Sequence, residues 1–122
     1  MKFGASTPIL RMFNEAKARE FYINWLGFKI DFEHRFETDV PLYMGISRGA
    51  CKLHLSEHHG DSAPGAAVRI QVDGLDEYHR ALSEAVYKFY RPVIQAMEWG
   101  TREMAVQDGF GNKLIFFDEP GR

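Results

Sequence analysis

Three histidines and two carboxylates make residues 54–61 the densest group of potential metal ligands in this sequence: His54, Glu57, His58, His59 and Asp61. Neighbouring strand residues point to opposite faces, so His58 and His59 can act together only where the strand has given way to a loop. Adjacent histidines without a spaced third ligand rarely form a closed metal site. The favoured interpretation is a polar strand end that runs into a solvated turn.

Aromatic side chains are the other chemical resource, with ten Phe, five Tyr and two Trp among 122 residues. Trp99 lies between Glu98 and Gly100, outside any helical stripe, and its amphipathic ring could stack on a planar ligand. A partly buried packing role for the same ring stays open. Because a small domain cannot easily bury all its rings, an aromatic-lined surface is the first feature to expect.

Composition narrows the function classes. Seventeen acidic against fifteen basic residues give a net charge of −2, which offers no general attraction to nucleic acid or anionic lipid. The single cysteine, Cys51, excludes an internal disulfide and is expected to be a small buried apolar residue. Neither a secretory signal nor a segment able to span a bilayer is recognisable, so a cytoplasmic protein without membrane or nucleic-acid partners is expected.

Two segments have the spacing of a helix with one apolar face. Asn14 is placed to cap the first and Gly27 to end it, and Asp73 is the expected cap of the second. The first stripe consists of Ala18, Phe21, Tyr22, Trp25 and Leu26, and the second of Leu75, Tyr78, Leu82, Ala85 and Val86.

The other periodic segments read as strands, expected at residues 28–34, 42–47, 51–56, 68–72, 101–107 and 113–118, with a further one at 8–13. Residues 48–50 and 108–112 connect hairpins. We interpret these segments as the order strand, helix, three strands, occurring twice, with two of the three strands after the second helix recognisable as ranges and with the helical stripes about 60 residues apart. We expect an α+β fold of two βαβββ modules, residues 1–59 and 66–122, joined by a linker at 60–65 within one domain, 1–122.

Two motifs carry a resemblance to a known family. Phe21-Tyr22 is followed by Leu26-Gly27-Phe28 at the end of the first helix, and residues 108–112 form a DGFGN turn close to DPDGN. Together they resemble the vicinal oxygen chelate superfamily, which includes glyoxalase I, extradiol dioxygenases and bleomycin resistance proteins. Arg48-Gly49 and Glu98-Trp99-Gly100 are most similar to the bleomycin resistance proteins.

The resemblance implies a U-shaped mixed sheet and a homodimer, either module-exchanged or side by side. The family's four metal-ligand positions align with Pro8, His54, Ala67 and Ile115. Three of these have no ligating side chain, whereas a transition-metal site needs three or four ligands. We therefore expect neither a metal nor another cofactor.

The implied function is that of a binding protein rather than an enzyme, sequestering a planar amphipathic compound in aromatic clefts at the dimer interface. A cationic glycopeptide antibiotic of the bleomycin class is one candidate, although Lys52, Arg69 and Lys113 on the expected cleft face weaken the match. The alternative is a metal-dependent glyoxalase-type lyase or dioxygenase with a shifted site around His54 and Glu57. Strand parity, the motif alignment and the acids available to oppose a cation nominate Phe32, Phe36, Tyr43, His54, Glu57, Arg69, Glu98, Trp99, Glu103, Ile115 and Phe117.

Overall fold

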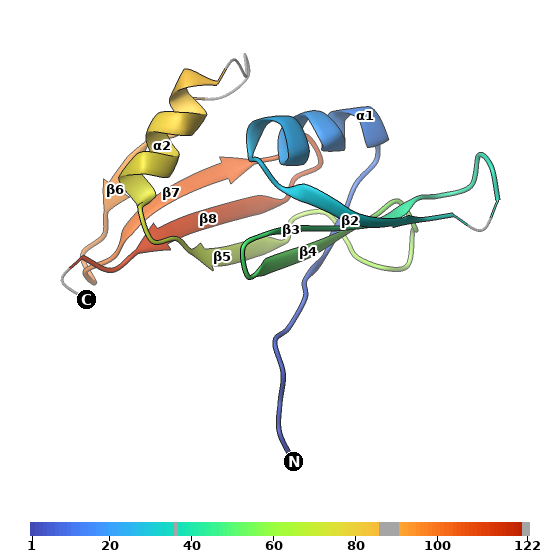
Figure 1. Ribbon diagram of the computed structural model, residues 1–122, viewed down its shortest axis with the longest axis horizontal. Coiled ribbons are helices and arrows are strands. Elements are labelled where there is room, and N and C mark those ends of the chain that lie inside the picture. The colour runs from blue at the N-terminus through green and yellow to red at the C-terminus, as the bar shows by residue number, and fades with distance from the viewer. Residues whose placement is uncertain (36, 86–90, 121–122) are drawn as a thin grey trace. The chain divides into compact units, whose positions relative to one another are not determined.

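The structure is a computed structural model that describes residues 1–35, 37–85 and 91–120 (Figure 1). The chain divides into two compact units, Met1–Pro64 and Gly65–Arg122. Each unit holds a four-stranded mixed sheet with a helical segment. None of the described helices is long and apolar enough to cross a membrane.

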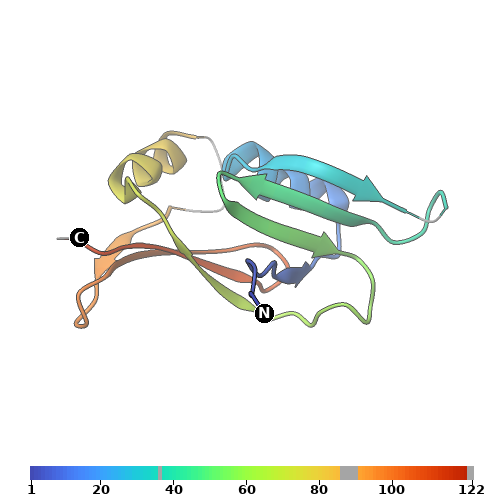
Figure 2. The ribbon, with the colours of Figure 1, turned by 60° about the horizontal axis from the view of Figure 1, so that its bottom comes forward.

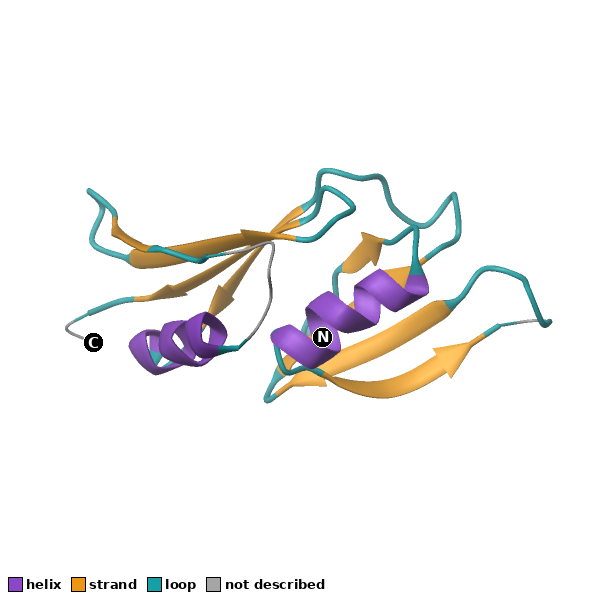
Figure 3. Cartoon of the chain, turned by 90° about the horizontal axis from the view of Figure 1, so that it is seen from above, coloured by secondary structure: helices purple, strands orange, loops and turns teal. Residues whose placement is uncertain are grey.

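The first unit has the sheet order β1-β4-β3-β2, in which β1 pairs with β4 in parallel and the other pairs are antiparallel. Its helical segment lies across one face of this sheet, as Figure 3 shows. The elements are β1 (Ile9–Arg11), α1 (Glu15–Ala18), the π-helix η1 (Arg19–Trp25), β2 (Lys29–His34), β3 (Tyr43–Arg48) and β4 (Cys51–Ser56).

The second unit repeats this topology with the order β5-β8-β7-β6 (Figure 2). β5 and β8 are parallel, and β8, β7 and β6 pair antiparallel. The two predicted βαβββ modules are therefore confirmed. The elements are β5 (Ala67–Gln71), α2 (Leu75–Glu84), β6 (Ile94–Ala96), β7 (Arg102–Gln107) and β8 (Lys113–Asp118).

The first helix differs from the expected regular α-helix because it widens into a π-helix after Ala18. The Leu26 N–H donates to the Phe21 carbonyl, five residues back, at 2.9 Å. Along this wider turn the side chains of Phe21, Tyr22, Trp25 and Leu26 are all buried. Both predicted end signals are confirmed: the Asn14 side chain accepts from the Lys17 N–H, and Gly27 ends the segment at φ +82°.

The predicted cap of the second helix is wrong. Gly74, not Asp73, is the N-cap residue of α2, with φ +88°, a left-handed conformation that glycine adopts without a Cβ clash. The Gly74 carbonyl accepts the Tyr78 N–H at 3.0 Å. The helix ends at Glu84, and Val86 of the expected stripe lies outside the described residues.

Each sheet packs its helix against one face and leaves the other open. In β4 and β8 the burial alternates, so that Leu53, Leu55, Leu114 and Phe116 face the helix, as parity predicts. The Tyr78 ring of α2 meets Phe116 edge-on, with centroids 5.1 Å apart. The open faces therefore carry the polar and aromatic side chains available to a ligand.

The hairpin turn between β7 and β8 is organised by one carboxylate. Asp108 Oδ1 accepts the backbone N–H groups of Phe110 and Asn112, at 2.8 and 3.0 Å. The Asn112 amide donates to the other oxygen, Oδ2, at 2.8 Å. This predicted turn is confirmed, and its hydrogen bonds fix the register of the two strands.

Candidate functional site

Three rings gather on the open face of the first sheet, contributed by β2, β3 and β4. The Phe32 and Tyr43 rings lie nearly parallel, 15° apart with centroids separated by 6.2 Å. The His54 ring stands almost perpendicular to both, at 5.2 Å from each. We call Phe32, Tyr43 and His54 the ring cluster. Because Phe32 is 44% exposed, the cluster presents an apolar ring surface to solvent.

A β-bulge turns Phe32 onto this face. Ile30 pairs with Ile46, but the next pair is Phe32 with Gly45, which leaves Asp31 as the extra residue. Strict alternation would have put Phe32 on the helix side with Ile30. A Cβ on Gly45 would lie well inside the 3.0 Å that real Cβ atoms keep from the Phe32 ring. The bulge and the glycine thus seat this ring.

The two polar members of the ring cluster share a hydrogen bond of 2.6 Å between Tyr43 Oη and His54 Nδ1. Burial, with the negative charge of Asp61 as a second cause, raises the pKa of Tyr43 above 10.0. The phenol therefore keeps its proton at neutral pH and can donate it to Nδ1. In that arrangement a neutral His54 carries its hydrogen on Nε2.

The polar residues after β4 hold the strand end in place. Glu57 Oε1 accepts the Leu42 N–H at 3.0 Å, and the Ser56 hydroxyl donates to Asp61 Oδ2 at 2.6 Å. The same hydroxyl accepts the His58 N–H at 3.0 Å. Across residues 1–35, 37–85 and 91–120 there is no group of three or more His, Cys, Asp or Glu side chains placed to hold a metal.

A second group of predicted residues meets on the open face of the second sheet. Arg69 Nη2 contacts Glu103 Oε2 at 2.9 Å, and its guanidinium lies 4.4 Å above the centre of the Phe117 ring. The Thr101 hydroxyl donates to the same Glu103 oxygen at 2.8 Å. We call Arg69, Glu103 and Phe117 the arginine cluster. Ile115 pairs with Arg69 across the strands and is half-buried beside it.

The arginine cluster shifts the titration of its acid. Hydrogen bonds from Arg69 and then Thr101 lower the pKa of Glu103 below 4.5, against the opposing effect of burial. The carboxylate is therefore ionised throughout the physiological range. Its charge is already met by the guanidinium next to it.

Trp99 and Glu98 lie in the turn between β6 and β7. The Met97 N–H donates to the Thr101 carbonyl at 2.8 Å, and Gly100 adopts φ +102°. Trp99 is 69% exposed, so the partly buried packing role is wrong for this ring. Its indole also lowers the pKa of Glu103, more weakly than Arg69 and Thr101 do.

Phe36 lies outside the described residues. Cys51 is half-buried rather than fully buried, because β4 begins at this residue and the Arg48–Cys51 pair closes the hairpin. Burial still raises the pKa of its thiol, which agrees with an unreactive cysteine.

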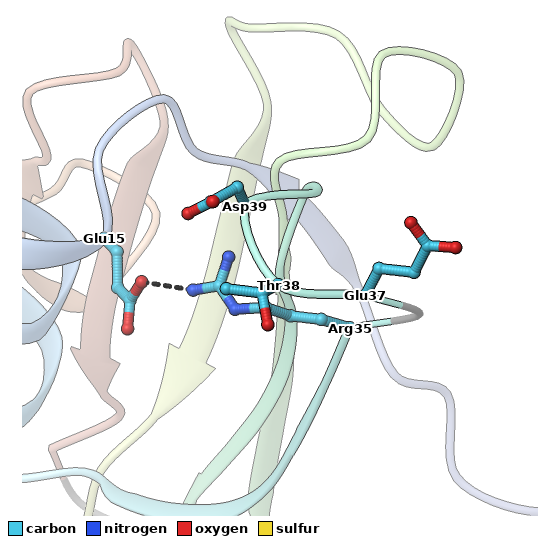
Figure 4. Close-up of a pocket in the computed structure, with 5 residues that line it drawn as sticks. All are labelled: Glu15, Arg35, Glu37, Thr38 and Asp39. Atoms are coloured by element: carbon cyan, nitrogen blue, oxygen red, sulfur yellow. Dashed lines mark hydrogen bonds and ion pairs between the residues drawn. The ribbon is translucent and has the colours of Figure 1, made fainter.

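A separate depression in the first unit is drawn in Figure 4. Its Arg35 contacts Glu15 Oε2 at 2.5 Å and donates to the Val40 carbonyl at 2.8 Å. The guanidinium is thus already neutralised, and none of the predicted site residues that the structure describes lines the depression. Its lining consists of Glu15, Arg35, Glu37, Thr38 and Asp39.

Three residues that position the clusters were missed by the sequence analysis. Gly45 had a readable signal, since a lone glycine within a strand often marks close approach by another group. Asp31 and Thr101 had none: a bulge has no fixed residue type, and a threonine at a strand end is common. Each acts by placing or holding a neighbour, Phe32 or Glu103.

The sequence model of one family, described as "Glyoxalase superfamily protein", matches residues 1–121. The chain belongs to the glyoxalase superfamily. The curated protein sequences gave no significant match.

Solved structures of the superfamily include close matches to this fold. The bleomycin-binding protein of bleomycin-producing Streptomyces verticillus, complexed with copper(II)-bleomycin, is 28% identical with a TM-score of 0.73, covering 100% of this chain and 99% of that chain. A bleomycin resistance determinant encoded on the transposon Tn5 is 23% identical, TM-score 0.73, covering 97% and 99%. A putative glyoxalase family protein from Bacillus anthracis is 16% identical, TM-score 0.68, covering 98% and 97%.

The residues of this superfamily member do not fit the metal that its catalytic relatives use. Of the four aligned positions only His54 has a ligating side chain. The shifted site around His54 and Glu57 does not fit either, because the described residues place no group of three or more His, Cys, Asp or Glu side chains around a common point. We therefore derive no reaction step through a metal.

Proposed function

We propose that this glyoxalase superfamily member binds a planar amphipathic small molecule and holds it without chemical change. The ring cluster carries the proposal, because it offers stacking surface on an open sheet face. The 28% identity to a bleomycin-binding protein, over essentially the full length of both chains, supports the same class of function.

The ring cluster suits a flat ligand for physical reasons. Aromatic pairs contribute roughly 0.5–1.5 kcal/mol beyond the area they bury. Phe32 and Tyr43 present nearly parallel planes, and His54 stands upright beside them. With Nδ1 engaged by Tyr43, the His54 Nε2–H is a donor for an acceptor atom on the ligand. Apolar rings beside one polar handle are typical of small-molecule sites.

Two finer points belong to the same proposal. We propose that the protein acts as a homodimer with ligand clefts at the interface between chains. We also propose that the biological ligand is a planar antibiotic, and bleomycin is the first compound to test.

The test is calorimetric titration with bleomycin, copper(II)-bleomycin and 2-naphthol, the last as a neutral planar probe. Phe32→Ala is expected to weaken binding about tenfold, the equivalent of about 1.4 kcal/mol. Phe3→Ala is the matched control, because Phe3 is 87% exposed in the N-terminal segment and outside the cluster. It is expected to leave binding unchanged.

The outcomes distinguish binding of planar molecules in general from binding of bleomycin itself. Binding of either bleomycin form that weakens about tenfold in Phe32→Ala supports the antibiotic assignment. Binding of 2-naphthol alone, with the same dependence on Phe32, keeps the binding function and rejects bleomycin. Absence of heat and of a melting-temperature shift with all three compounds would overturn the proposed function.

A further inference from the structure

We propose that the arginine cluster, on the open face of the second sheet, binds a planar aromatic carboxylate whose anionic group meets Arg69. This inference rests on the proposed function and specifies the ligand's chemical class. It departs from the expectation that acids on this face meet a cationic drug.

The two side chains of the Arg69–Glu103 ion pair differ in their exposure to solvent. The Glu103 side chain is only 7% exposed, whereas that of Arg69 is 46% exposed. A ligand that reaches this face therefore meets N–H donors and not carboxylate oxygens. Guanidinium groups favour carboxylates, to which they can donate two parallel hydrogen bonds.

Arg69 is held in place before a ligand arrives. Phe117 supports the flat side of the guanidinium, and the Glu103 contact uses Nη2 at one edge. Thr101 fixes Glu103 in turn. Within the described residues the guanidinium donates no hydrogen bond to another group, so its remaining edges are available. A side chain already ordered loses less entropy when it binds.

The charged residues around Arg69 also favour an anionic ligand. Lys113 is exposed on the same face of β8 and has no ion pair within the described part of the chain. Glu119 acts on Arg69 more weakly than Glu103 does. Of the acids expected to oppose a cation, Glu57 and Glu103 already accept hydrogen bonds, and only Glu98 is exposed.

Apolar side chains beside Arg69 suit the flat part of the ligand. Ile115 lies opposite Arg69 in the strand pairing, and Phe117 lies under the guanidinium. Apolar surface thus borders the charged donors directly. A ring that bears a carboxylate satisfies both neighbours at once, whereas a free inorganic anion uses only one.

The experiment compares three probes with one ring system: 2-naphthoate, 2-naphthol and 2-naphthylmethylammonium. Calorimetry gives the affinities, and the arginine Nε–H signals in ¹⁵N NMR spectra report contact at the guanidinium. We expect 2-naphthoate to bind at least about tenfold tighter than the ammonium probe. In Arg69→Gln the affinity for 2-naphthoate is expected to drop to that for 2-naphthol.

Two further variants keep the test decisive. Arg80→Gln alters the net charge equally at an exposed residue of α2 and is expected to retain the preference for 2-naphthoate. Because Arg69→Gln leaves Glu103 without its ion-pair partner, the double variant Arg69→Gln/Glu103→Gln serves if the single one unfolds. It too is expected to lose the preference.

A preference for the ammonium probe, or a preference for 2-naphthoate that survives removal of Arg69, would overturn this inference. The binding function would stand in either case. If none of the three probes nor bleomycin binds, the proposed function itself fails.

Discussion

Glu103 and Arg69 form an ion pair whose two side chains differ in exposure. The Glu103 side chain is buried on the open face of its sheet, whereas the Arg69 side chain is exposed to solvent. A buried carboxylate without a partner is strongly unfavourable, so Arg69 and Thr101 are needed to keep Glu103 ionised there. The function of Glu103 is therefore to position a cation rather than to contact a ligand.

The pH dependence of stability tests this role. The pKa of Glu103 is lowered on folding from 4.5, so its ionised form stabilises the protein above about pH 4.5, and that contribution is lost as the pH falls further. We expect the difference in unfolding free energy between wild type and Glu103→Gln to shrink between pH 6 and pH 3. Urea denaturation at a series of pH values measures it. A constant difference would contradict the assigned ionisation.

Tyr43 gives a second prediction at this scale. Tyr43→Phe keeps the ring contacts but removes the hydrogen bond to His54 Nδ1. Stability is expected to fall by about 1 kcal/mol. The ¹⁵N shifts of the His54 ring are expected to show the Nε2–H form in wild type and a mixture of tautomers in the variant. Unchanged ring shifts would mean that the phenol does not select the tautomer.

At the scale of elements, the end of the first helix depends on a long-range contact. Arg48 Nη1 donates to the carbonyls of Leu26 and Gly27, both at 3.1 Å. A side chain from the β3–β4 hairpin thus satisfies carbonyls that a helix end leaves unpaired. A Cβ on Gly27 would collide with this guanidinium, whereas one on Gly49 would meet open space.

These two glycines form a matched pair, since both have positive φ, +82° and +58°. Gly49→Ala is expected to destabilise by about 1 kcal/mol from backbone strain alone. Gly27→Ala also displaces Arg48 and is expected to cost roughly 1.5–3 kcal/mol more. Urea denaturation of both variants compares them. Equal losses would show that the Arg48 cap contributes nothing.

The elements that the sequence predicted well are those in which burial dominates. The stripe at Phe21, Tyr22 and Trp25 is buried as the periodicity indicates, and the apolar alternation in β4 and β8 holds. Local chemistry was less readable. Residues 73 and 74 are an aspartate and a glycine, and the glycine is the N-cap of α2 because the backbone there is left-handed. The three-residue strand β6 is too short to show a period.

The candidate site was predictable to the extent that strand parity governs it. Parity on β5 and β8 brings Arg69, Ile115 and Phe117 to one face, and the structure places them together. Parity fails at Phe32, which was nominated by family resemblance, because the bulge reverses the alternation after Ile30. Which residues bind a ligand stays a prediction.

At the scale of the whole molecule, net charge conceals how the charges are distributed. The chain carries −2, yet Asp31, Asp61 and Glu103 accept hydrogen bonds from neighbouring side chains while Lys52 and Lys113 are exposed. Asp31 accepts from the Ser47 hydroxyl at 3.1 Å, and Asp61 from Ser56 at 2.6 Å. An anionic ligand is thus compatible with an acidic protein.

The proposed homodimer is tested by mass. Sedimentation equilibrium is expected to give twice the chain mass of 14.0 kDa at micromolar concentration. In each unit some large apolar side chains are exposed, Phe13 in the first and Val93 and Trp99 in the second, and we propose that a second copy covers some of them. A mass of one chain across the concentration range would reject the dimer and require each chain to bind ligand alone.

The bulge at Asp31 has a consequence for how such a protein can change its specificity. Deleting this one residue would give regular pairing in which Phe32 still lies opposite Gly45 and Glu33 opposite Met44, so the ring cluster would be kept. If β2 instead kept all its residues and paired regularly without the bulge, every side chain beyond Asp31 would exchange faces. Phe32 would then leave the ring cluster for the helix side, and Glu33, which now pairs with Arg19 there, would enter the open face. Loss of the bulge without loss of a residue would therefore replace an aromatic floor with a negative charge.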